Sequence, residues 1–357
     1  TLAPVAVLVF LLMMGYTATY AAAGSILATI VFSWLTPRKM GPALILEAVI
    51  DGVKNATPTA VLLVSIGLLV GVLGTTGFGP TFSLMIIEWS GGNLIFMLLL
   101  ITLVSLVLGM GLPVTAAYIV LATISAPSLA DLITTNNLVE VLTSGEVPET
   151  VTMMLSLVDP DIAAKIAAGL GAEEARSLLA GLPIEIRAAL RPQLLSPEVI
   201  TTSLLAAHMI IFWVSQDSNV TPPVCLPAFV AAAIAKSPPM ATGFTAFGLC
   251  KGLYIIPLLF AFTPLLGGDL TETLLVFIPA TVGLHALSAA MSGVVETPIA
   301  WPGRLAAAAV GAALLWPLGL EIKAPLLLAY LAYAVFDWRR RRAAEANSEV
   351  DARPLPR

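Results

Sequence analysis

Two short runs of Gly, Pro and polar residues interrupt the apolar sequence of this chain, and both have the chemistry to bind a small ion or substrate. They are Gly109-Met110-Gly111-Leu112-Pro113-Val114-Thr115 and Asp217-Ser218-Asn219-Val220-Thr221-Pro222-Pro223. Gly and Pro break helices, and inside a membrane the freed backbone groups must find other partners. A bound cation or an anionic substrate can satisfy them.

In the first run, we expect a helix over 93–108 to end and the carbonyl oxygens near 106–112 to lose their helical partners. Such oxygens are hard ligands suited to a small cation, and the Thr115 hydroxyl would add another. The candidate site residues of this run are Gly109, Met110, Gly111, Pro113 and Thr115. Among them, Gly109 and Thr115 are candidate Na⁺ ligands.

In the second run, Asp217 and Asn219 offer side-chain oxygens directly after an expected helix over 199–215. We expect the next helix to begin at Pro222-Pro223, so that the positive end of its dipole faces a substrate carboxylate. The candidate site residues of this run are Asp217, Ser218, Asn219, Thr221, Pro222 and Pro223, with Thr221 as a third candidate Na⁺ ligand. An alternative for Asp217 is a loop position just outside the membrane.

The composition is that of an integral membrane protein. Hydrophobic residues make up 58% of the chain and charged residues only 11%, and the mean hydropathy is +0.97, whereas about a quarter of the residues of a typical soluble domain are charged. We therefore expect an all-α polytopic membrane protein. The expected spans are 18–35, 57–76, 93–108, 199–215, 249–266, 273–292, 304–320 and 324–338, with interfacial helices over 41–55 and 77–88.

Charge patterning divides the chain into four parts. Residues 129–200 hold ten acidic and four basic residues, so a small acidic helical insertion should lie outside the membrane, with a helix start at Asp159-Pro160 and a break at Arg191-Pro192. The predicted parts are transmembrane helices with the first run over 1–130, the acidic insertion over 131–198, transmembrane helices with the second run over 199–338, and a basic tail over 339–357. Arg339 to Arg342 predict a cytoplasmic C-terminus.

At the two runs the chain resembles the large membrane subunit of the tripartite ATP-independent periplasmic (TRAP) transporters, in the form fused to the small subunit. The residues that carry the resemblance are 109–118, Ala126-Pro127, Ala206-Ala207-His208, Asp217, 220–224, 231–235, Gly67 and 77–79. The order of the two runs matches the family. The resemblance covers about 20–130 and 199–265 and suggests the C-terminal half of a permease whose first half lies upstream of Thr1.

The resemblance implies an elevator-type fold half and a Na⁺-coupled secondary importer of small organic acids in the bacterial inner membrane. It implies as partners a periplasmic substrate-binding protein, the upstream half of the permease, the helices of the small subunit and the lipid bilayer. No nucleic acid partner is expected, and no cofactor apart from Na⁺ as the coupling ion.

Two other functional classes stay open at this point. One is a non-transporting membrane assembly or sensor subunit. The other, an intramembrane enzyme, would need a Ser/His pair, facing aspartates or a metal-binding helix, and no such motif occurs in the sequence. We therefore expect no enzyme activity, and we interpret His208 and His285 as hydrogen-bonded structural residues.

Overall fold

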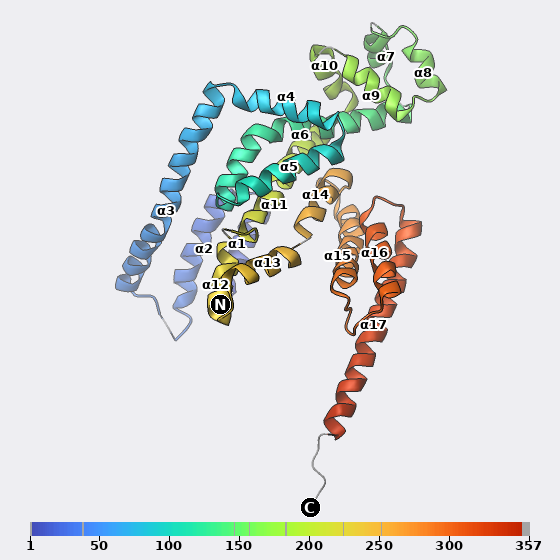
Figure 1. The fold of residues 1–357 in the computed structure, drawn as a ribbon. Coiled ribbons are helices and arrows are strands. Elements are labelled where there is room, and N and C mark those ends of the chain that lie inside the picture. Colours follow the sequence, from blue (N-terminus) through green and yellow to red (C-terminus); the bar gives the residue numbers. More distant parts are fainter. Residues whose placement is uncertain are drawn as a thin grey trace, which may run out of the picture. The chain divides into compact units, whose positions relative to one another are not determined.

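The computed structural model describes residues 2–37, 39–145, 147–156, 158–182, 184–223, 225–250 and 252–351, which form helices joined by loops (Figure 1). Within these ranges the only extended pairing is an isolated bridge between Val294 and Pro298. By length and composition, five stretches of helix among the described residues could cross a membrane: Pro42–Thr75, Val114–Ser144, Pro197–Asn219, Pro239–Phe262 and Leu270–Ser292. The prediction of an all-α polytopic membrane protein is confirmed. The chain divides into two units, Thr1–Leu69 and Val70–Arg357.

The first unit contains a helical hairpin and most of a long helix. The elements are α1 (Ala3–Met13), α2 (Ala18–Ser33) and α3 (Pro42–Thr75). The separate interfacial helix predicted over 41–55 is wrong, because α3 continues through Pro58 without ending. Glu47, Asp51 and Lys54 are spaced four and three residues apart and lie on one face of α3, which we call its polar stripe. The rest of this continuous helix is mostly apolar.

In the second unit, an apolar core forms where three helices meet. The elements of this part are α4 (Phe78–Ser90), α5 (Leu94–Gly109), α6 (Val114–Ser144), α11 (Pro197–Ser215), the 3₁₀ helix η1 (Gln216–Asn219), α12 (Leu226–Ala235), α13 (Pro239–Leu249) and α14 (Gly252–Phe262). Ile101 of α5, Leu121 of α6 and Ile210 of α11 are fully buried in this core. The core therefore holds together the three helices that lead into the two interrupted runs.

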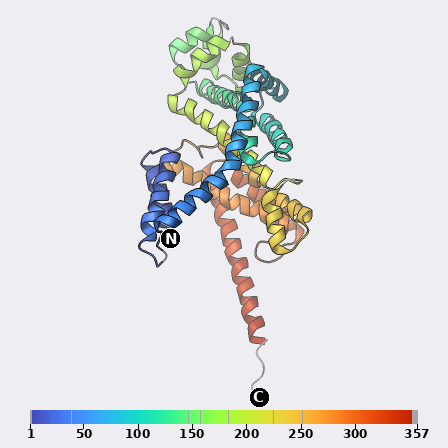
Figure 2. The same ribbon diagram turned by 90° about the vertical axis from the view of Figure 1, so that its left-hand side faces the viewer.

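The acidic insertion is a small helical bundle with a core of its own. Its helices are α7 (Glu149–Ser156), α8 (Ile162–Ala168), α9 (Ala172–Gly181) and α10 (Ile184–Leu194), grouped beyond the end of α6 in Figures 1 and 2. Leu138 and Leu142, from the last turns of α6, are buried in this core with Leu155, Leu179 and Leu190. The boundary predicted at residue 130 therefore falls inside a continuous helix.

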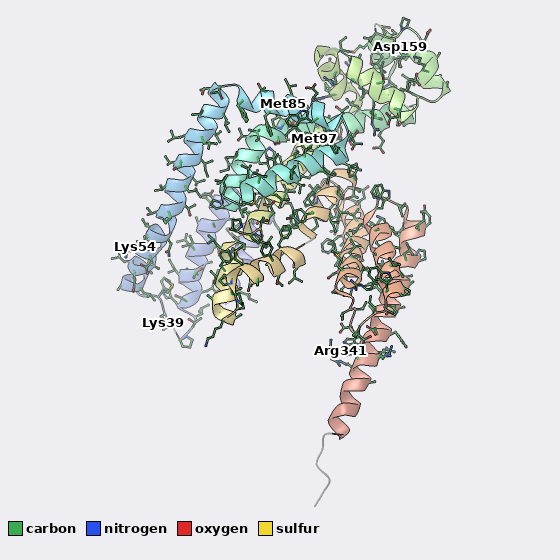
Figure 3. The ribbon with its side chains drawn as sticks, in the orientation of Figure 1. Lys39, Lys54, Met85, Met97, Asp159 and Arg341 are labelled. Atoms are coloured by element: carbon green, nitrogen blue, oxygen red, sulfur yellow. The ribbon has the colours of Figure 1, made fainter. Side chains whose placement is uncertain are left out.

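Two local predictions in the insertion are wrong. Helix α8 begins at Ile162, with Asp161 at the N-cap position, and not at Asp159-Pro160. The Asp159 carboxylate instead accepts a hydrogen bond from the backbone N–H of Asp161 and forms an ion pair with Lys165. Pro192 lies inside α10 and does not end it. Figure 3 places Asp159 on the outer part of this bundle.

The last part of the chain contains α15 (Leu270–Ser292), α16 (Trp301–Leu315) and α17 (Leu320–Asp351). Helices α15 and α16 approach closely at glycines: a Cβ on Gly311 would lie 2.9 Å from the carbonyl oxygen of Gly283, as is common where helices pack in membranes. Asp337 of α17 accepts hydrogen bonds from the backbone N–H groups of Glu296 and Thr297. Helix α17 extends through the basic tail predicted over 339–357 as far as Asp351, and residues 352–357 lie outside the described ranges.

Candidate functional site

The first run forms the short connection between α5 and α6. Helix α5 ends at Gly109 and α6 begins at Val114, with Pro113 at its N-cap position. The backbone N–H of Met110 donates to the Leu106 carbonyl at 3.2 Å, and that of Leu112 donates to the Leu108 carbonyl at 2.9 Å. The prediction that the carbonyls near 106–112 all lose their partners is therefore wrong for these two. The helical donor for Gly109 would be Pro113, which has no N–H.

The second run is a tight loop that is closed by its own hydroxyl groups. Helix α11 leads directly into η1. The Thr221 hydroxyl donates to the Asp217 carbonyl at 2.7 Å, and the Ser218 hydroxyl donates to the Ser215 carbonyl at 3.0 Å. The Asn219 amide donates to the Gln216 side chain at 3.2 Å. These bonds satisfy the backbone where the helix is interrupted.

The helix after this loop starts later than predicted. Helix α12 begins at Leu226, with Cys225 at the N-cap position, whereas the sequence predicted a start at Pro222-Pro223. The reason is a further proline in the first turn of α12, Pro227, because Pro is favoured where its missing N–H is not needed. Pro222 and Pro223 belong to the turn before the helix, so the dipole of α12 does not begin at them.

The two runs meet at Gly109. A Cβ on this residue would lie 2.6 Å from the Oδ1 atom of Asp217 and 3.2 Å from the backbone nitrogen of Ser218. With a Cβ at position 109 the Asp217 carboxylate would have to move and the backbone at Ser218 would have to give by a few tenths of an ångström, so glycine allows the end of α5 to approach η1 without displacing either. The structure therefore brings the first and second runs together through Gly109, Asp217 and Ser218.

The Asp217 carboxylate is the least satisfied polar group of this contact. Asp217 is 0% exposed, and neither of its carboxylate oxygens accepts a hydrogen bond of full geometry from a described residue, although the Ser105 hydroxyl and the backbone N–H of Ser218 lie close enough to interact with it. Its position is thus not that of an exposed loop residue. An unpaired buried carboxylate is costly, so it calls for a bound cation or a proton.

Two side chains near Asp217 were not predicted from the sequence. The Ser105 hydroxyl of α5 lies close to this carboxylate, and the Tyr254 hydroxyl of α14 lies close to both Asp217 and Thr221. Neither hydroxyl makes a hydrogen bond of full geometry to a described group. Ser105 could have been predicted, because it and Thr102 are the two polar residues of apolar helix α5 and it lies one helical turn before Gly109. Tyr254 could not, because only the folding of α14 against α11 brings it here.

Other predicted site residues lie on the outside of the loops. Met110, Gly111, Pro113 and Thr115 are exposed, as is Pro223. The described contacts do not bring Thr115 together with Thr221, so the Na⁺ ligand set predicted from these two hydroxyls remains a prediction. The residues assembled at one place are Gly109, Asp217, Ser218 and Thr221, with Ser105 and Tyr254 beside them.

The two histidines each contact a tyrosine. His208 Nδ1 lies 3.1 Å from the Tyr118 hydroxyl, and His285 Nδ1 lies 2.9 Å from the Tyr330 hydroxyl. These hydrogen bonds agree with the structural role expected for both rings. Within the described ranges, no three His, Cys, Asp or Glu side chains gather in a group that could hold a metal ion.

Interrupted helices that meet around a buried carboxylate in a multi-pass helical protein are typical of membrane transport proteins. Residues 1–266 match the family model of the DctM component of tripartite ATP-independent periplasmic transporters. The chain therefore belongs to this family, whose members are the membrane permeases of TRAP transporters and work with a periplasmic binding protein and a small subunit.

The match covers both interrupted runs and ends before α15. Helices α15 to α17 thus lie outside the matched residues. Neither a curated protein nor a solved structure matches the chain. The prediction that the chain corresponds to the C-terminal half of a permease stays a prediction.

Proposed function

We propose that this chain is the permease component of a Na⁺-coupled secondary importer of small organic acids, delivered by a periplasmic binding protein. We place it in the bacterial inner membrane with its C-terminus in the cytoplasm, on the basis of the Arg339 to Arg342 cluster. The observation that carries the proposal is the Asp217 carboxylate, which is fully buried and accepts no hydrogen bond of full geometry from a described residue.

A cation bound beside Asp217 would neutralise this carboxylate. Gly109, which contacts Asp217, has a carbonyl that lacks its helical donor because residue 113 is proline, and this oxygen is a further candidate ligand. Oxygen ligands of this kind suit a hard cation such as Na⁺. The positive charge would in turn attract the carboxylate of an organic acid. We further propose that loading and release occur by an elevator-type movement, in line with the resemblance noted from the sequence.

The test is uptake of a radiolabelled organic acid into proteoliposomes that contain the complete transporter, with and without a Na⁺ gradient. We expect Asp217→Asn to weaken Na⁺ dependence strongly, because a charge-assisted interaction is worth about 1.5–3 kcal/mol, which corresponds to about 10-fold to 100-fold in affinity. The matched control is Asp51→Asn, because Asp51 lies on the exposed polar stripe of α3 and should leave uptake unchanged.

Two results would contradict the ion site. One is wild-type uptake that is indifferent to Na⁺, and the other is full Na⁺ dependence in the Asp217→Asn variant. If Thr221→Val also leaves uptake unchanged, the loop held by the bond from Thr221 to Asp217 has no part in ion coupling. A wild-type chain that assembles with its partner subunits and yet carries no substrate would favour the assembly or sensor subunit instead.

A further inference from the structure

A second candidate binding site lies at one end of the α15–α17 helices, away from both interrupted runs. A cavity of about 260 Å³ opens between the end of α14, the first turns of α15 and the connection from α16 to α17. Its walls are mostly apolar, with Phe262, Leu275, Val276 and Leu318 among the lining residues. Two charged side chains, Glu272 and Lys323, line the same cavity.

The positively charged residue that lines this cavity, Lys323, has no anionic partner among the described residues. The Lys323 side chain belongs to a residue only 8% exposed, and among the described residues it makes neither a hydrogen bond nor an ion pair. Its nitrogen is not one of the fully buried atoms without a partner, so the ammonium group reaches the open space of the cavity that the residue lines. Lys323 therefore has the properties of a group that binds an anion from outside the chain.

The negatively charged residue that lines the cavity, Glu272, does not pair with Lys323. Glu272 is exposed, and its carboxylate accepts a hydrogen bond from the backbone N–H of Asp269 at 3.3 Å, as part of the capping box that begins α15. It forms no ion pair with Lys323 within 4.0 Å among the described residues. The cavity thus presents a positive charge on the mostly buried residue Lys323 and a separate negative charge on the exposed residue Glu272.

The position of the cavity along α17 matches a membrane surface. Helix α17 is not among the five described stretches that by length and composition could cross a membrane, but its apolar segment over 324–338 separates Lys323 from the arginines 339–342. The length is about 24 Å at 1.5 Å per residue, against a hydrocarbon thickness of about 30 Å. Trp316 is exposed beside the cavity, and Trp338 contacts Arg342 at the opposite end. Because Trp is enriched at both membrane interfaces, we infer that the cavity lies at the level of the lipid head groups, at the end of the apolar segment opposite the arginines.

We propose that this cavity binds a phospholipid with a zwitterionic head group that ends in a primary ammonium. Lys323 would pair with the phosphate, which is the part of such a head group closer to the acyl chains, and Glu272 would pair with the ammonium at its tip. The apolar walls would contact the first part of an acyl chain. A purely anionic lipid would leave Glu272 facing a like charge, and a soluble head group would leave the apolar walls uncovered.

The test is native mass spectrometry of the purified full chain in detergent, after incubation with an equimolar mixture of phosphatidylethanolamine, phosphatidylglycerol and phosphatidylcholine. We expect the wild-type chain to retain phosphatidylethanolamine at least about tenfold over the other two, the equivalent of about 1.4 kcal/mol. Lys323→Met should abolish this retention, and Lys323→Arg should preserve it. Lys54→Met is the matched control, because Lys54 is exposed on α3 and its loss should change nothing.

Glu272→Gln tests the second half of the head group independently of Lys323. Gln can replace Glu in a capping box, so the variant should fold normally and yet lose the preference for phosphatidylethanolamine over phosphatidylglycerol. Retention of phosphatidylethanolamine by Lys323→Met at the wild-type level would overturn the proposal. So would a wild-type preference for phosphatidylglycerol, or binding of free phosphoethanolamine as tight as binding of the lipid.

Discussion

At the scale of single residues, the contact between Gly109 and Asp217 joins the two interrupted runs. The end of α5 approaches η1 so closely that a methyl group at position 109 would overlap the Asp217 carboxylate. The same contact excludes water from a charged side chain, which strengthens its interaction with any bound cation. The absence of a Cβ at position 109 therefore affects both how closely α5 packs on η1 and how well the Asp217 carboxylate is shielded from water.

We predict that Gly109→Ala destabilises the chain by about 1–3 kcal/mol, as overpacking of a filled interior does, and lowers uptake by at least as much as Asp217→Asn. Thermal unfolding in detergent and proteoliposome uptake measure the two effects. Gly111→Ala is the control, because a Cβ there would meet nothing within 4 Å and the residue does not adopt positive φ. Equal behaviour of the two alanine variants would show that the contact is not as tight as described.

Sequence reasoning at this scale identified the right residue types but only part of their arrangement. Gly109, Asp217 and Thr221 could be predicted because Gly, Pro and charged residues stand out in apolar sequence. The Thr221 hydroxyl binds the backbone of its own loop, which residue type alone does not predict. Tyr254 was missed because its place beside Asp217 depends on the packing of α14.

At the scale of helices and loops, the acidic insertion is stabilised by its own core and by several ion pairs at its surface. Lys165 Nζ lies 2.7 Å from Asp159 Oδ2 and 3.5 Å from Glu174 Oε1. The hydrogen bond from Lys165 lowers the pKa of Asp159 below its usual 3.8, and the bond to Asp159 raises the pKa of Lys165 above 10.5. Because both side chains are partly exposed, the stabilisation is small.

The directions of these pKa shifts set the pH range in which the pair acts. A lowered carboxylate pKa stabilises the fold above its unfolded value and is lost as the pH falls through the folded value, whereas a raised ammonium pKa acts below its unfolded value. We therefore predict that Asp159→Asn lowers the unfolding temperature of the insertion modestly between about pH 4 and pH 10, and that the difference from wild type disappears below the usual pKa of Asp. Asp161→Asn, which lacks the ion pair, serves as the control in the same melting experiment.

Helices α15 and α16 pack through small residues. A Cβ on Gly311 would lie 2.7 Å from Leu287 Cγ and 2.9 Å from the Gly283 carbonyl oxygen, whereas one on Gly303, also on α16, would lie 3.6 Å from its nearest neighbour. We predict that Gly311→Ala destabilises the chain by about 1–3 kcal/mol and that Gly303→Ala is close to neutral. A melting curve of each variant in detergent decides the matter, and equal melting temperatures would contradict this packing.

At the scale of the whole chain, the sequence predicted the helical class and four of the five described stretches that could cross a membrane, because long apolar runs leave few alternatives. The spans predicted over 18–35, 93–108, 304–320 and 324–338 are not among these five, and Val114–Ser144 was not predicted as a span. Helix ends were less predictable. Pro58 and Pro192 lie inside helices, whereas Pro227 lies in the first turn of α12. A proline in the sequence therefore does not by itself predict whether a helix begins, ends or continues there. The boundary of the insertion was also missed, because α6 continues through it to supply part of the core of the insertion.

The path of the chain through the insertion has a thermodynamic consequence. Helix α6 starts at the first interrupted run and ends in the insertion, and α11 leaves the insertion and ends at the second run. Helices α6 and α11 thus connect the acidic insertion to both sides of the Gly109–Asp217 contact. Suppose that a protein binds the insertion more tightly at one separation of helices α6 and α11, and that this separation alters cation binding at Asp217. That protein then changes the cation affinity, and cation binding changes the affinity for the protein by the same factor.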